Sequence, residues 1–276
     1  TSRLIRRLYF ISKTQNNMAL SNSQKEKIAA LLERKIEYKL RRYARETSSM
    51  PFLTRLIQDG EKVAAYSFIH SIATTLGMSI YEDVSKIIAE ETADECFTKY
   101  DVGGVISREQ KSVIDDIVRK LRNGEKEVNN TQEIKLVLDA SAKDGKAQKE
   151  GRIADFYMRR GGKEHYFEIK TVKPNIDVFT KSKTKLLEWV ARRRSPIKVF
   201  LAFPYNPYHP QPYERFTEQG VLDRGEEFLI GKEYWDFLGG ENTFDELLAL
   251  FDSVGKKFKE KIKDKIQEVA QSKMSN

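Results

Sequence analysis

Three charged residues near the middle of the chain have the types and spacing needed to hydrolyse a phosphodiester. Asp155 lies in one apolar segment, and Glu168 and Lys170 lie in a second one. Because side chains alternate along an extended strand, Glu168 and Lys170 share a face. A hairpin through the loop 159–164 would bring Asp155 alongside Glu168. We therefore expect two carboxylates and an ammonium group to meet at one place.

This combination suits metal-assisted hydrolysis. Mg²⁺ prefers hard oxygen ligands and is often held by one or two carboxylates with substrate phosphate and water, so Asp155 and Glu168 are the candidate ligands. The ion polarises the phosphoryl oxygen and activates a bound water. Lys170 would stabilise the developing charge or assist the water. The alternative is a charged hairpin with surface salt bridges. The flanking apolar residues and the basic helix that follows favour a site.

The positive charge of the chain is concentrated in one segment. The 276 residues contain 49 Lys and Arg against 41 Asp and Glu, a formal net charge of +8. Residues 181–198 contain seven basic residues and one acidic residue. A surface that binds a phosphate backbone needs such a local excess of positive charge. A solvated basic helix is the alternative. The candidate contacts to such a backbone are Lys173, Lys181, Lys185 and Arg192.

Several classes of protein are excluded by composition. The single cysteine, Cys96, rules out an intramolecular disulfide framework and a cysteine-based metal site. The sequence contains no run of 18 apolar residues, so no membrane-spanning helix is expected. It also contains no Walker or Rossmann pattern. We therefore expect a cytoplasmic protein with no membrane association.

Periodicity predicts an α/β fold, a mixed β-sheet core flanked by helices with a helical N-terminal part. A single domain over 1–276 is expected, mainly helical to about 125, with an α/β core over 130–205 and a loop and C-terminal helices over 206–276. Ser23 and Glu26 resemble a capping box, and no strand is expected before 133. The expected helices are 23–45, 64–76, 80–96, 111–122, 178–194 and 243–270, and the expected strands are 133–139, 152–158, 165–172 and 197–203.

A proline-rich loop follows the last expected strand. Residues 204–215 contain four of the seven prolines, which would hold a recognition loop in shape at low entropic cost. A stiff structural crossover packed by its tyrosines is an equal alternative. The side chains able to read bases are Asn206, His209, Gln211 and Arg215.

The hairpin resembles the PD-(D/E)xK nuclease superfamily. Ala154-Asp155 stands where that family often has Pro-Asp, and Glu168-Ile169-Lys170 matches the second half of its motif. The segment 76–82 is also similar to a helix start found in several type II restriction endonucleases. In that setting the helix acid adds a carboxylate to the metal site, so the resemblance implies Glu82 as a third ligand. An ordinary first-turn glutamate is the alternative.

Two later segments, 203–208 and 234–240, extend the resemblance over about residues 66–255. They are similar to the branch of type II restriction endonucleases that cuts GGNCC-like sites. The resemblance implies a Mg²⁺-dependent homodimer that cleaves double-stranded DNA at a short sequence, with a cognate DNA methyltransferase in the same system. A repair or junction-resolving nuclease of the same fold, and a non-catalytic nucleic-acid-binding protein, are the alternatives.

Overall fold

The computed structural model describes residues 20–46, 50–170, 173–213 and 220–271, which fall into two compact units. The first, here called the sheet unit, comprises Ile88–Phe244. The second, here called the helical unit, comprises Leu20–Ile87 and residues 245–271. In the described part of the chain, no helix is both long and apolar enough to cross a membrane.

A five-stranded mixed sheet forms the centre of the sheet unit, and its strands follow one another in chain order. The first three strands pair antiparallel, and the third, fourth and fifth pair parallel. Parallel neighbours need a crossover, and α8 (Ile176–Arg193) lies in the connection between the third and fourth. The predicted mixed α/β fold is thus confirmed. The strands are β1 (Glu95–Asp101), β2 (Ile153–Arg160), β3 (Lys163–Ile169), β4 (Lys198–Phe203) and β5 (Phe228–Ile230).

Helices cover both faces of this sheet. On β3, Tyr166 lies against Trp189 of α8, whereas the next residue, Phe167, lies against Tyr234 and Phe237 of α10 (Lys232–Gly239). Because alternate residues of a strand point to opposite faces, α8 and α10 lie on opposite sides of the sheet.

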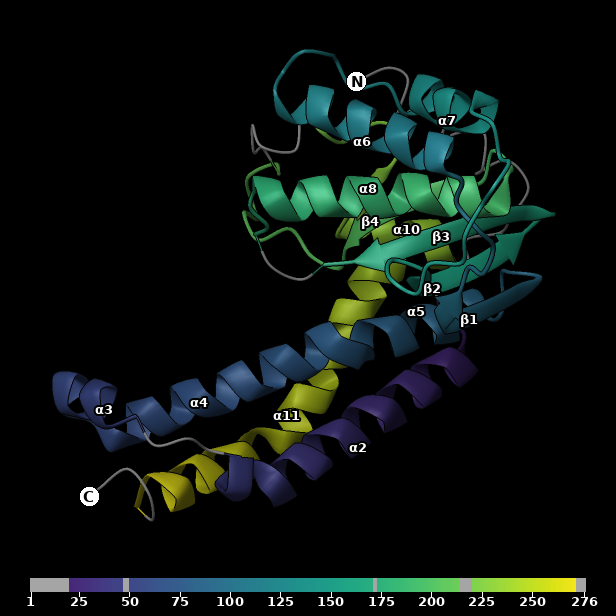
Figure 1. The fold of residues 1–276 in the computed structure, drawn as a ribbon. Coiled ribbons are helices and arrows are strands. Elements are labelled where there is room, and N and C mark those ends of the chain that lie inside the picture. Colours follow the sequence, from purple (N-terminus) through teal and green to yellow (C-terminus); the bar gives the residue numbers. More distant parts are fainter. Residues whose placement is uncertain (1–19, 47–49, 171–172, 214–219, 272–276) are drawn as a thin grey trace. The chain divides into compact units, whose positions relative to one another are not determined.

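The helix α8 is itself enclosed. Two helices, α6 (Arg108–Arg122) and α7 (Asn130–Asp139), pack against it on the side away from the sheet (Figure 1). Ser107 begins α6 with a capping box, in which its hydroxyl and the Gln110 side chain each accept the other residue's backbone N–H. Every residue from 186 to 192 is consequently buried, and most of α8 has no solvent-exposed face.

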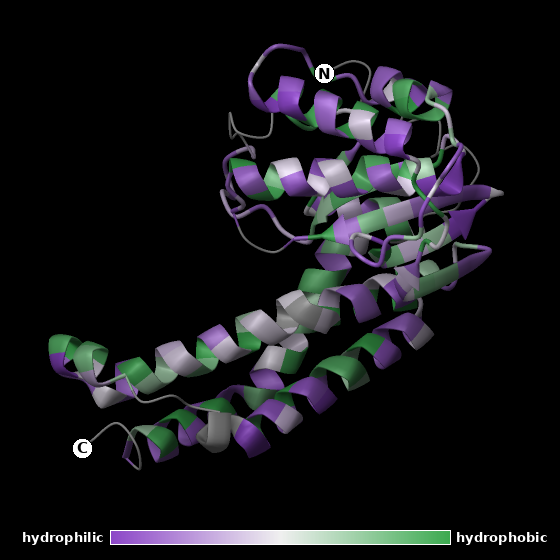
Figure 2. Cartoon of the chain, viewed as in Figure 1, coloured by the Kyte–Doolittle hydropathy of each residue, from purple (hydrophilic) through white to green (hydrophobic). Residues whose placement is uncertain are grey.

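The helical unit is built on its own apolar contacts. Val63 and Phe68 of α4 pack with Val269 near the end of α11, and Lys257 of α11 pairs with Glu33 of α2 at 2.7 Å. Figure 2 shows hydrophobic and hydrophilic residues alternating along α2 and α11, the pattern of helices with one buried side. The elements of this unit are α2 (Asn22–Glu46), α3 (Pro51–Ile57), α4 (Gly60–Thr75), the π-helix η1 (Leu76–Ile80), most of α5 (Tyr81–Ala89) and most of α11 (Thr243–Val269).

Three expectations about the first half of the chain are wrong. The helix expected over 80–96 ends at Ala89, and residues 95–101 form β1, although no strand was expected there. The segment 133–139, expected to be a strand, belongs to α7. The cap of α2 uses Ser21 and Gln24, whose side chains each accept the other's backbone N–H, in place of Ser23 and Glu26. The short elements α3, β5 and α10 were not expected.

Candidate active site

The pairing of β2 with β3 brings Asp155 beside Glu168. Phe156 lies opposite Phe167 in the register, so the next positions outward are 155 and 168. The backbone N–H of Ile169 donates to Asp155 Oδ2 at 2.7 Å, which fixes that carboxylate at the end of the hairpin. The hairpin therefore gathers the two acids that its sequence spacing indicates.

Lys170 completes the grouping expected from the sequence. Its Nζ lies 2.5 Å from Glu168 Oε1, so the two side chains share a face as their spacing predicts. The backbone N–H of Lys170 donates to the carbonyl of Ala202 on β4 at 2.9 Å. The lysine therefore projects from backbone that is held by the sheet.

Two further groups from α8 reach the same carboxylate. Ser182 donates its hydroxyl to Glu168 Oε1 at 3.3 Å, and Lys185 Nζ lies 3.3 Å from Glu168 Oε2. The Lys185 ammonium also lies 5.2 Å from the centre of the Trp189 ring, within cation–π range. Lys185, expected to contact the DNA backbone, is thus placed in the carboxylate cluster. Residues at i and i+3 of a helix share a face, so the 182/185 spacing was the available signal.

The charges of this cluster cancel formally. Asp155 and Glu168 supply two negative charges, and Lys170 and Lys185 supply two positive ones. Burial raises the pKa of Asp155, although the charge of Lys185 and the Ile169 N–H oppose the shift. Burial would also raise the pKa of Glu168, but Lys185 and Lys170 outweigh it and the net shift is downward. The site is therefore electrically balanced, and not the negative pocket that its carboxylates alone suggest.

The oxygen atoms present suit a divalent cation. Glu168 is 4% exposed, and its Oε2 is a carboxylate oxygen paired with the Lys185 ammonium at 3.3 Å. Such an atom beside a second carboxylate is a hard oxygen donor of the kind Mg²⁺ binds. No group of three or more His, Cys, Asp or Glu in the described ranges is placed to hold a metal ion. Glu82, the expected third ligand, lies buried in the first turn of α5 in the helical unit, and its role as a ligand stays a prediction.

The residues expected to contact DNA, on α8 and just before it, differ in exposure. Lys173 and Lys181 are exposed, with Lys173 Nζ 4.2 Å from the centre of the Tyr208 ring. Arg192 is 5% exposed, and its guanidinium donates to the carbonyls of Gln148 and Glu150 at 3.2 and 3.1 Å. Arg192 is therefore enclosed at this point of α8, and its role as a contact to the DNA backbone stays a prediction.

The proline-rich loop has both structural and exposed parts. Asn206 is engaged within the loop, since its Nδ2 donates to the Gln211 carbonyl at 2.8 Å and its Oδ1 accepts the Tyr208 N–H at 2.9 Å. Tyr213 is buried against the sheet unit's core. The side chains of His209 and Gln211 are exposed. Arg215 lies outside the described residues. The described contacts support the structural alternative for Asn206 and Tyr213.

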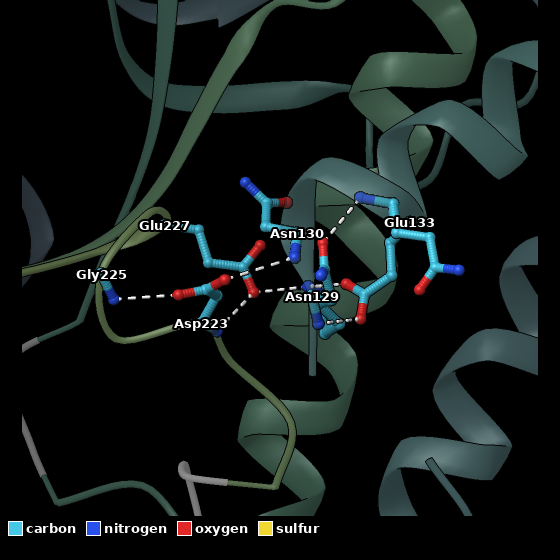
Figure 3. Close-up of polar contacts among 8 residues, drawn as sticks. Asn129, Asn130, Glu133, Asp223, Gly225 and Glu227 are labelled. Atoms are coloured by element: carbon cyan, nitrogen blue, oxygen red, sulfur yellow. Dashed lines mark hydrogen bonds and ion pairs between the residues drawn. The ribbon is translucent and has the colours of Figure 1, made fainter. Parts of the chain in front are cut away.

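A second charged cluster, which the sequence did not indicate, lies between α8, α7 and the turn before β5. Lys183 Nζ lies 2.5 Å from Glu133 Oε2 and 2.5 Å from Glu227 Oε1, and none of the three side chains is exposed. Figure 3 shows both glutamates bonded to nearby backbone: Glu133 accepts the Asn129 N–H at 2.9 Å and Glu227 accepts the Asp223 N–H at 3.0 Å. The cluster fastens α8 to α7 and to the turn before β5.

Comparison with known proteins gives one consistent result. A family model described as "Type II restriction endonuclease, HinfI" matches residues 20–255. The type II restriction enzyme MjaII of Methanocaldococcus jannaschii is 30% identical over 213 residues, which are 70% of this chain and 56% of MjaII. The chain thus spans little more than half the length of that relative. HgiCII of Herpetosiphon aurantiacus, also a type II restriction enzyme, is 28% identical over 195 residues, 68% of this chain and 71% of HgiCII.

Proposed function

The chain belongs to the HinfI family of type II restriction endonucleases, and from this premise we propose that it hydrolyses phosphodiester bonds of double-stranded DNA at a short specific sequence. The observation that carries the proposal is the hairpin register, which sets Asp155 beside Glu168 and Lys170 within a matched region of that family.

Asp155 and Glu168 are the residues that would hold the metal ion, which we propose to be Mg²⁺. When bound, such an ion polarises a phosphoryl oxygen and lowers the pKa of a coordinated water. The N–H of Ile169 orients the Asp155 carboxylate, and Ser182 and Lys170 orient that of Glu168. Both ligands are therefore held before substrate arrives, which is what precise positioning of the reacting groups requires.

Lys170 is the proposed catalytic cation. Its ammonium is partly exposed and anchored at Glu168, so it can face both the carboxylate and an approaching phosphate. A positive charge at this place stabilises the negative charge that develops on the phosphoryl oxygens. It can also donate a hydrogen bond that orients the attacking water.

The finer proposals concern DNA recognition and assembly. Lys173 and Lys181, which are exposed in the sheet unit, are the proposed contacts to the DNA backbone. His209 and Gln211 are the proposed base-reading residues of the proline-rich loop. We further propose a GGNCC-like target, a homodimer that places one active site on each strand, and a cognate DNA methyltransferase that protects the host's own sites.

Digestion of a plasmid in Mg²⁺ tests the function. The wild-type chain should give discrete, reproducible fragments, and sequencing of their ends yields the target and the stagger of the cut. Cleavage confined to branched or damaged DNA would replace this proposal with a repair or junction-resolving nuclease. If the Asp155→Ala variant produces the same fragments at the same rate, the proposed active site is wrong.

A further inference from the structure

Lys185 lies beside a carboxylate that is proposed to bind the metal ion. Its ammonium lies 3.3 Å from Glu168 Oε2, one of the carboxylate oxygens proposed to bind the metal ion. Lys185 is also near enough to Asp155 for its charge to oppose the effect of burial on that carboxyl group more strongly than the charge of Lys170 does. One lysine thus balances both of the carboxylates proposed to hold the metal.

The two lysines of the site hold Glu168 in different ways. Lys170 directly follows β3, the strand that carries Glu168, and its Nζ lies 2.5 Å from Oε1, which also accepts the Ser182 hydroxyl. Lys185 comes from α8 and makes a longer ion pair of 3.3 Å to Oε2. The contact of Lys185 to Oε2 is therefore the longer of the two ion pairs, and it is the one that a cation bound at Oε2 would replace.

We propose that Lys185 is a resident counter-cation of the metal site, which holds Glu168 in the metal-free protein and must leave Glu168 before a divalent cation can bind. This inference rests on the proposed function, because it takes the two carboxylates to be metal ligands. Its physical basis is charge: an ammonium group and a divalent cation repel each other strongly at such short range. Metal binding is consequently weaker than the two carboxylates alone would allow.

The test is the affinity of the protein alone for Mn²⁺, measured from the electron paramagnetic resonance signal of the free ion. Lys185→Met removes the competing charge and keeps an unbranched side chain against Trp189, so its Mn²⁺ affinity should rise by at least about fivefold. Lys185→Arg keeps the charge and should bind Mn²⁺ as the wild type does. An affinity of Lys185→Met that equals or falls below that of the wild type, including the case in which neither binds, overturns the inference. An equal gain in Lys185→Arg overturns it too.

Matched controls separate this result from folding and from the proposed function. Lys111→Met also removes a lysine from an ion pair with a glutamate of α8, since Lys111 Nζ lies 2.8 Å from Glu188 Oε1, and it should leave the Mn²⁺ affinity unchanged. Near-ultraviolet circular dichroism checks that each variant folds. If Lys185→Met binds no tighter while Mg²⁺-dependent plasmid cleavage persists, the counter-cation role fails and the proposed function stands.

Discussion

The buried cluster of Lys183, Glu133 and Glu227 allows a quantitative prediction. Lys183→Met removes the ammonium and leaves two carboxylates in a place where none of the three side chains is exposed. Breaking a buried ion pair by removing one partner costs about 3–5 kcal/mol. We therefore expect the free energy of unfolding at pH 7, measured by urea denaturation, to fall by about this amount.

The stability loss of Lys183→Met should depend on pH in a defined direction. Burial raises the pKa of Glu227, and Lys183 is the charge that most opposes the shift, so removal of Lys183 raises that pKa further. A carboxyl group whose pKa is higher in the folded than in the unfolded state destabilises the fold above its folded pKa, and this effect disappears below its unfolded pKa. The deficit of Lys183→Met should therefore shrink on acidification from pH 7, by up to about 1.4 kcal/mol per pH unit for each extra proton bound.

Two comparisons make this reasoning refutable. Adding Glu133→Gln and Glu227→Gln to Lys183→Met removes the unpaired charges and should recover most of the lost stability. Lys111→Met, which breaks a partly exposed ion pair, should cost about 1 kcal/mol or less. A loss below about 1 kcal/mol in Lys183→Met, or a deficit that does not change with pH, would show that the cluster does not hold α8 in the way described.

Two other predictions concern single residues. Arg192→Met should lower the free energy of unfolding by about 2–3 kcal/mol, because it removes the buried charged donor of two part-buried hydrogen bonds, and should leave the salt dependence of DNA binding unchanged. Lys181→Met should have little effect on urea denaturation and should reduce the slope of log DNA affinity against log salt concentration by about one. A stability loss in Lys181→Met together with a changed salt slope in Arg192→Met would contradict the placement of both residues. Asp155→Asn should raise the free energy of unfolding of the metal-free protein at pH 7, because burial raises the pKa of Asp155 and the charged form is disfavoured in the fold. This gain should vanish as the pH falls below the unfolded pKa of an aspartate, and a lower stability of Asp155→Asn at pH 7 would refute it.

The parts of the site that local sequence determines could be predicted. Alternation along two strands and a glycine-containing turn are short-range signals, and they place Asp155, Glu168 and Lys170 correctly with respect to one another. The paired glycines of the turn, Gly161 and Gly162, both have positive φ, which favours glycine. Nothing distant in the chain is needed to specify this arrangement.

The parts that depend on distant partners could not be predicted. In α7, apolar residues at 134, 136 and 138 alternate as in a strand, but 134 and 138 are also one helical turn apart, so the pattern fits both structures. The Asn129 side chain accepts the Gln132 N–H and begins the helix. The exposure of a basic residue on α8 is likewise decided by what packs against it. Arg192 meets carbonyls of the segment 148–150, and Lys185 meets Glu168, so charge counting along α8 overestimated its basic surface.

The measurement that tests the central claim most directly is the single-turnover rate of DNA cleavage in Mg²⁺ by Asp155→Asn, with Lys111→Met as the folded control. Asp155→Asn keeps the shape of the side chain and an oxygen able to accept the Ile169 N–H, but removes the charge proposed to bind the metal. The account predicts a rate reduced by at least about a hundredfold, on the scale of removing one preorganised electrostatic group from an active site, and a normal rate for Lys111→Met. Cleavage by Asp155→Asn at a rate close to that of the wild type would contradict it.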